Sequence, residues 1–159
     1  MAEGEFALVR QHLEAALLQT VEWVGDHDLY AMLADVAVRQ GDLPGLQHYA
    51  PLAEESATRY NHPLYLAVAQ RAFGVAHRLV GEYDRAQARL KEALDSFTQI
   101  GAHWQIGRTH FELGELARAR GDAATAIGQL RIARDEFDKQ GAVPDRNQAR
   151  AALAELGGL

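Results

Sequence analysis

Glycine recurs at a fixed interval of 40 residues in this 159-residue chain, at Gly41, Gly81 and Gly121, and an acidic residue follows each one. Midway between them stand residues that also tolerate a positive φ: Asn61, Gly101 and Gly141. Residues of this kind end α-helices in the left-handed conformation. The chain is therefore divided, roughly every 20 residues, into one helix and one short turn. A fixed period in the range of about 20–50 residues is typical of a solenoid of stacked units.

The helix breakers and the 3.6-residue periodicity of apolar residues together predict eight helices. Their expected ranges are 5–23, 27–40, 44–60, 64–80, 84–100, 103–120, 124–140 and 145–157. We expect a single all-α domain, 1–159. It would contain an N-terminal capping helix (1–26), three helical hairpins (27–60, 64–100 and 103–141) and a C-terminal capping helix (144–159).

Composition excludes several classes of protein. The chain has no cysteine, which removes disulfides, thiol catalysis and thiolate metal sites and fits a reducing compartment. Its net charge of −6 disfavours direct binding of nucleic acid. No run of 18 apolar residues predicts a membrane span, and Glu3 and Glu5 stand where a signal peptide would carry Lys or Arg. We therefore expect a cytoplasmic protein that binds neither nucleic acid nor membrane.

Side-chain size, and not only polarity, is preserved when the chain is shifted by 40 residues. Small residues match small ones and large residues match large ones, as in the pairs Gly74/Gly114, Ala86/Ala126, Leu90/Leu130, Ala93/Ala133 and Phe97/Phe137. A random pair of amphipathic helices would preserve polarity alone. Small positions allow two helices to cross closely, and the large positions fill the space beside the crossing.

This pattern resembles the tetratricopeptide repeat. The residues that carry the resemblance are Phe73-Gly74, Gly81-Glu82, Ala86, Leu90 and Ala93, and they recur as Leu113-Gly114, Gly121-Asp122, Ala126, Leu130 and Ala133. The period of 40 residues is longer than the usual ~34. The longer form is similar to the repeats in sensor regions of large bacterial transcription regulators and peptide-sensing regulators. The resemblance implies a right-handed α–α superhelix.

Catalytic and metal-binding motifs are not found in the sequence. No two of the seven histidines are four residues apart. His103 and His110 are spaced to share a helix face, but no carboxylate stands at ligand spacing to complete a metal site. A glycine-rich phosphate loop and a nucleophile turn are also missing. We expect no enzymatic activity, no metal and no cofactor.

In the resembling family, the concave face is lined by the first helix of each hairpin. The matching residues here are the expected partner-binding set: Arg39, Arg71, Val75, Arg78, Arg108, Phe111, Glu115 and Arg118. Five arginines then face three acids, Asp28, Asp35 and Glu115, so the surface is expected to be net positive and to suit an acidic or C-terminal peptide with apolar side chains. The alternative is that these arginines pair with Asp35, Glu115 and neighbouring acids on a solvated face.

The expected first helix is apolar on more than one side. One stripe contains Phe6, Val9, Leu13, Leu17, Val21 and Val24, and a second contains Leu8, Ala15 and Leu18. Such a helix either packs under the first hairpin or forms a homodimer contact. The sequence thus supports two hypotheses. The first is a scaffold that binds a protein or peptide in its concave groove. The second is a structural, oligomerisation or sensor module of a larger bacterial regulatory protein.

Overall fold

The computed structural model describes residues 3–19 and 26–158, and within them it contains eight α-helices and no strand. The helices are α1 (Glu3–Gln19), α2 (Asp26–Gln40), α3 (Leu43–Arg59), α4 (Pro63–Leu79), α5 (Tyr83–Gln99), α6 (His103–Ala119), α7 (Ala123–Lys139) and α8 (Val143–Glu155). Their bounds agree with the expected ranges to within two residues. The exception is the end of the first helix, where expected residues 20–23 lie outside the described residues.

The turns between successive helices use the residues that the 20-residue spacing picked out. Every one of these six positions from 41 to 141 has a positive φ, between 50° at Asn61 and 81° at Gly81. At Gly81 the Glu82 N–H donates to the His77 carbonyl (2.9 Å) and the Gly81 N–H donates to the Arg78 carbonyl (3.1 Å). This is the hydrogen-bond pattern of a Schellman motif. The same turn therefore ends each helix from α2 to α7.

Glycines inside α4 and α6 allow each of these helices to cross its partner closely. A Cβ on Gly74 would lie 2.6 Å from Cγ of Leu90 in α5, and one on Gly114 would lie 2.8 Å from Cγ of Leu130 in α7. Both distances are too short for any larger side chain. The size pattern preserved at a shift of 40 residues is thus the contact pattern of the hairpins.

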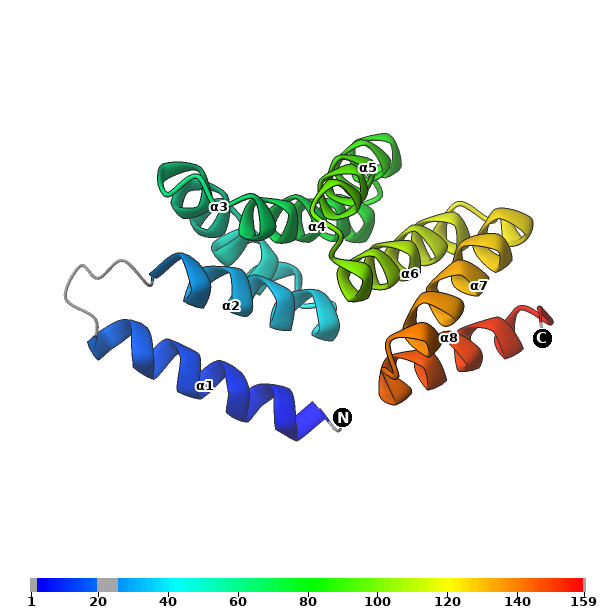
Figure 1. Cartoon of the computed structure of the whole chain (residues 1–159), viewed down its shortest axis with the longest axis horizontal. Helices are drawn as coiled ribbons and strands as arrows, with labels where there is room; N and C mark the ends of the chain where they lie inside the picture. Colours follow the sequence, from blue (N-terminus) through cyan, green and yellow to red (C-terminus); the bar gives the residue numbers. More distant parts are fainter. Residues whose placement is uncertain (1–2, 20–25, 159) are drawn as a thin grey trace.

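The helices stack as an α–α solenoid, which confirms the expected fold class. Helices α2, α4 and α6 form its inner side, α3, α5 and α7 lie outside them, and α8 follows α7 at the C-terminal end (Figure 1). The core is divided into clusters between neighbouring helices. One is centred on Leu33 and Leu46, another on Phe97, and others on Leu90, Leu130 and Phe137.

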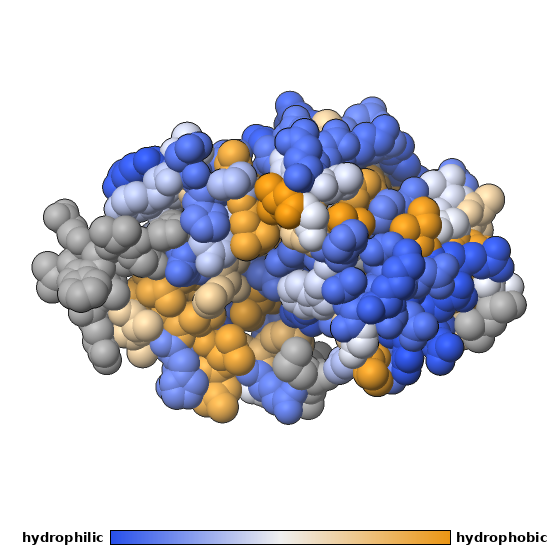
Figure 2. All heavy atoms as spheres, viewed as in Figure 1, coloured by the Kyte–Doolittle hydropathy of each residue, from blue (hydrophilic) through white to orange (hydrophobic). Residues whose placement is uncertain are grey.

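Helix α1 packs one face on the first hairpin and leaves apolar side chains on another. Leu13 and Leu17 contact the cluster around Leu33. On the other side Leu8 is 54 % exposed and Leu18 is 90 % exposed, and Figure 2 shows apolar side chains gathered over this region. The packing role expected for this helix is therefore present, while the second apolar stripe has no cover among the described residues.

Two polar contacts also hold α1 in place. Arg10 pairs with Asp42 at 2.6 Å and donates to Gln40. The Tyr49 hydroxyl donates to the Glu14 carboxylate at 2.5 Å, and burial together with this carboxylate raises the pKa of Tyr49 to about 12. Helix α1 is thus attached to both α2 and α3.

Candidate binding groove

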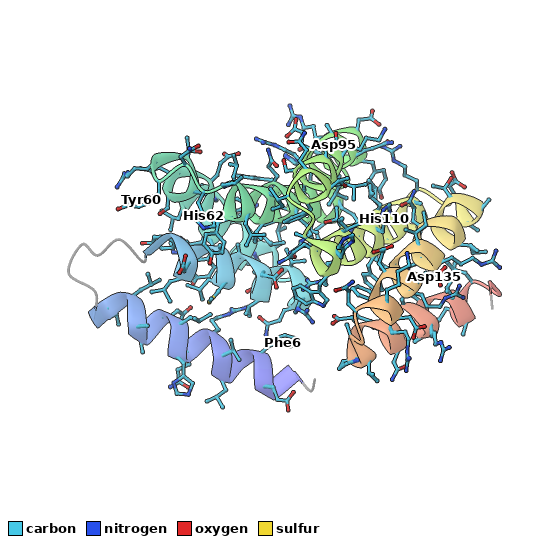
Figure 3. The ribbon with its side chains drawn as sticks, viewed as in Figure 1. Phe6, Tyr60, His62, Asp95, His110 and Asp135 are labelled. Atoms are coloured by element: carbon cyan, nitrogen blue, oxygen red, sulfur yellow. The ribbon has the colours of Figure 1, made fainter. Side chains whose placement is uncertain are left out.

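A cavity of about 910 Å³ lies on the inner side of the solenoid. Its walls come from six helices: α2, α4 and α6 along the inner side, the beginning of α1, Phe137 of α7, and α8. Phe6, Leu79 and Phe111 supply apolar surface to it. Figure 2 shows the hollow in this region, and Figure 3 labels Phe6 on the α1 side of it. The remaining lining is dominated by charged side chains.

Asp35 of α2 is the centre of the first charged cluster. Its carboxylate accepts from Arg71 at 2.8 Å and from Arg108 at 3.2 Å, and Arg39 lies 3.7 Å away. Burial alone would raise the pKa of Asp35, but Arg108, Arg71 and Arg39 together lower it to about 2. One carboxylate from α2 therefore joins arginines of α2, α4 and α6.

Arg71 is the most buried of these arginines, with no exposed surface. Its guanidinium lies 5.2 Å from the centre of the Phe97 ring and donates to the Gln105 carbonyl at 3.4 Å. Burial lowers the pKa of Arg71 to about 10, so it stays charged at neutral pH. A buried charge of this kind depends on its carboxylate partner.

Asp145, in the first turn of α8, forms a second charged cluster. Its carboxylate lies 3.3 Å from Nη2 of Arg39 in α2 and accepts from the indole N–H of Trp104 in α6 at 3.1 Å. The guanidinium carbons of Arg39 and Arg108 lie 5.4 Å and 5.3 Å from the centre of the Trp104 ring. Asp145 thus connects the last helix with the first hairpin across the groove.

The remaining arginines of the lining are paired as well. Arg78 of α4 contacts the buried Glu112 of α6 at 3.1 Å. Burial raises the pKa of Glu112, and Arg78 offsets this only in part. Arg118 is 41 % exposed and contacts Glu115 at 2.6 Å and Glu155 of α8 at 2.8 Å.

The structure corrects two of the expected site residues. Val75 is fully buried in the cluster around Leu33, and Arg71 is fully buried between helices, so neither lies at the groove surface. The other six line the cavity: Arg39, Arg78, Arg108, Phe111, Glu115 and Arg118. That these six contact a partner stays a prediction.

The expected net positive charge is also corrected. The lining contains four arginines and four carboxylates, Glu112, Glu115, Asp145 and Glu155. The arginines are paired with acids, as the alternative interpretation of the sequence held. These ion pairs lie inside a groove, whereas the alternative interpretation placed them on a solvated face.

Sequence reasoning missed four residues of this site: Trp104, Glu112, Asp145 and Glu155. Glu112 stands 40 residues after Ala72, at the same position of the repeat. A charged side chain at a position where the preceding repeat has a small, buried one is a signal of an internal ion pair. Asp145 and Glu155 belong to the C-terminal helix, for which the repeat gives no inward-facing positions. Nothing in their spacing indicated that α8 borders the groove.

The histidines do not assemble a site. His110 bonds with Gln129 at 2.7 Å, and His103 lies 3.6 Å from Glu136. Within 3–19 and 26–158, no group of three or more potential ligands could hold a metal ion. In the same part of the chain, no helix combines the length and the hydropathy that crossing a membrane requires.

Comparison with known proteins agrees with the stacked helical hairpins. No family model matches the chain. A TPR repeat-containing protein of Synechococcus elongatus is 29% identical over 133 residues, which are 78% of this chain and 30% of that protein. The chain is thus similar to a TPR repeat-containing protein, and its fold is a stack of helical hairpins.

Solved structures of similar fold include two proteins. A Rap protein complexed with Competence and Sporulation Factor has a TM-score of 0.76 at 18% identity, covering 98% of this chain and 51% of that one. BtubC (BKLC) from P. vanneervenii has a TM-score of 0.61 at 17% identity, covering 98% of this chain and 73% of that one. The chain thus spans about a third of the curated relative's length and about half of the Rap protein's.

Proposed function

We propose that the groove binds a segment of another polypeptide. The observation that carries this proposal is the cavity of about 910 Å³ bordered by six helices. This volume falls in the range of ligand pockets, roughly 300–1,000 Å³. The Rap protein of similar fold was determined with a bound factor, which supports a binding role for a solenoid of this shape.

Recognition in this groove would combine apolar anchors with charged positions. Leu79 is 39 % exposed and lines the cavity together with Phe111, so these side chains offer apolar contact. Arg118 is the most exposed of the lining arginines and is the one most open to a partner. The protein would act by binding and not by bond making, in a cytoplasmic setting that its lack of cysteine favours.

The proposal is tested by changing one apolar and one cationic position of the groove. We expect the double variant Leu79→Glu, Arg118→Gln to keep its helicity while capture of partner proteins in a pull-down falls at least about tenfold, since both an apolar contact and a cation are lost. Arg78→Glu is unsuitable, because the new carboxylate would lie against buried Glu112.

Ile132→Glu is the matched control for this experiment. Ile132 of α7 is 43 % exposed and does not line the cavity, so its substitution places one carboxylate at an exposed apolar position away from the groove, as Leu79→Glu does within it. Capture by the groove variant at the wild-type level would remove the groove from the proposal.

A second candidate function is self-association through α1 as part of a larger regulatory protein. Exposed Leu8 and Leu18 favour it. If α1 forms a homodimer, Leu18→Glu should convert a dimer to a monomer in analytical ultracentrifugation with little change in stability. Leu17 is a poor choice for this test because it contacts the core. A wild-type protein that sediments as a monomer would contradict self-association, and the proposal that the groove binds a polypeptide would remain.

A further inference from the structure

Helix α8 supplies half of the negative charge that faces the groove. The four arginines of the lining come from α2, α4 and α6, and these helices contribute only two carboxylates, Glu112 and Glu115. Asp145 and Glu155 of α8 supply the other two. Without α8, the four lining arginines would face two lining carboxylates, and the only other carboxylate described beside them is Asp35, which Arg39, Arg71 and Arg108 share. The last helix therefore neutralises a surface that the repeats alone would make cationic.

The apolar residues of α8 and its charged residue Asp145 contact different helices. Its apolar residues Ala149 and Leu153 are buried against Phe137 and Leu130 of α7. By contrast, Asp145 reaches past α7 to Arg39 of α2 and Trp104 of α6. A change in the partner of Asp145 would therefore leave the packing of α8 on α7 in place.

The surroundings of Asp145 have the chemistry of a carboxylate site. A guanidinium and an indole N–H both point at its oxygens, and a second guanidinium, that of Arg108, lies beside the same indole ring. Arginine and N–H donors are the groups that hold carboxylates of peptide ligands. The side chains of Arg39 and Asp145 are 16 % and 11 % exposed, and both line the cavity, so a ligand in the groove would meet this pair.

We propose that Asp145 occupies a carboxylate site, and that the groove takes a polypeptide segment whose own carboxylate replaces Asp145 on Arg39 and Trp104. This inference rests on the proposed peptide-binding function. The exchange keeps Arg39 paired throughout, and the displaced Asp145 carboxylate, whose side chain is 11 % exposed and lines the cavity, would have to be solvated within the groove. It also gives the groove specificity for an acidic side chain or a free C-terminus, because a neutral segment cannot take the place of Asp145.

Two substitutions at one ion pair distinguish exchange from a structural role. Asp145→Asn removes the internal competitor, keeps an acceptor for Trp104 and leaves Nη2 of Arg39 without its carboxylate, while Asp35 stays 3.7 Å from Nε of Arg39. Arg39→Gln removes the group that both carboxylates use. Exchange predicts that the first variant binds ligand about tenfold more tightly and the second about tenfold more weakly. A purely structural pair would give weaker binding in both variants.

The probe is a library of random nonapeptides, prepared in one arm with a free C-terminus and in the other with an amide. Binders are selected on the wild-type protein and on each variant, and the dissociation constant of the strongest is measured by calorimetry. Asp138→Asn is the matched control, because Asp138 pairs with Arg146 in the same part of the molecule but does not line the cavity. Binding that is lost on amidation identifies a C-terminal carboxylate, and binding that survives amidation but needs Asp or Glu identifies a side chain.

Each outcome decides between the proposals. Tighter binding by Asp145→Asn, weaker binding by Arg39→Gln and no change in Asp138→Asn support exchange. Weaker binding by both variants at the ion pair, or binders without any carboxylate, overturns exchange while the groove function stands. No binder to any of the proteins overturns both. Circular dichroism confirms folding, and Asp145→Ser serves as a second variant if Asp145→Asn proves unstable.

Discussion

Replacing Asp35 with Asn is expected to lower the free energy of unfolding by about 3–5 kcal/mol, the usual loss when one member of a buried ion pair is removed. Asp35 contacts Arg71, whose side chain is wholly buried, and also Arg108 and Arg39. The neutral amide would leave Arg71 and Arg108 without the carboxylate that they contact, while Arg39 would keep Asp145. Urea denaturation at neutral pH, followed by far-UV circular dichroism, measures the loss.

Asp84→Asn is the control for this substitution. Asp84 pairs with Arg120 at 2.8 Å, but its side chain is fully exposed, and surface pairs of this kind contribute little. We expect no measurable change in the urea midpoint of this variant. Equal losses in the two variants would show that the inner cluster around Asp35 does not hold the helices together.

The effect of Asp35→Asn should also depend on pH. In the folded protein the pKa of Asp35 is about 2, below its ordinary value of 3.8. A carboxylate with a lowered folded pKa stabilises the protein above its unfolded pKa and loses that contribution as pH falls through its folded pKa. The stability difference between wild type and variant should thus be constant above about pH 5 and shrink toward pH 2. A difference that does not change with pH would contradict the assigned pKa.

Phe137→Ala is expected to destabilise the protein by about 3–5 kcal/mol, because truncating a buried aromatic ring removes its contacts and leaves a cavity. Phe137 is 1 % exposed, and a Cβ on Gly107 would lie 2.9 Å from its ring. Its ring also packs against Ala149 and Trp104. Phe137 of α7 thus holds α6 and α8 in register, and hydrogen exchange should show faster opening of α8 in the variant.

Ile132→Ala in the same helix is the matched control. Ile132 is 43 % exposed, so its truncation should cost well under about 1 kcal/mol. Urea denaturation of the two variants side by side gives the comparison. If both variants lose the same stability, the fold does not depend on the aromatic position that Phe97 and Phe137 share.

Most of the fold could be predicted from the sequence, because the repeat fixes it locally. Each residue that ends a helix, from Gly41 to Gly141, has a left-handed backbone conformation. Each glycine–leucine pair such as Gly74 and Leu90 lets the two helices of a hairpin cross closely. These requirements involve residues close together in the chain, and a single sequence shows them twice or more. Helix bounds and hairpin contacts follow from them.

The site could be predicted only in part, because it depends on how the hairpins stack. Position within the repeat placed Arg78 and Arg118 correctly in the lining. It also placed Arg71 there, but the inner helices approach closely enough to bury this arginine between Asp35 and Phe97. The contribution of Asp145 depends on where α8 comes to lie, and a helix outside the repeat carries no periodic signal for that.

The pair between Asp35 and Arg108 joins residues 73 positions apart, in the first and third hairpins. A simple stack tolerates the addition or removal of a whole unit, since each unit touches only its neighbours. This chain should not, because an extra hairpin inserted after α5 would preserve every adjacent contact and yet separate Arg108 from its carboxylate. Charge matching therefore restricts insertion between the hairpins that carry Asp35 and Arg108, and these hairpins should melt in a single transition and not unit by unit.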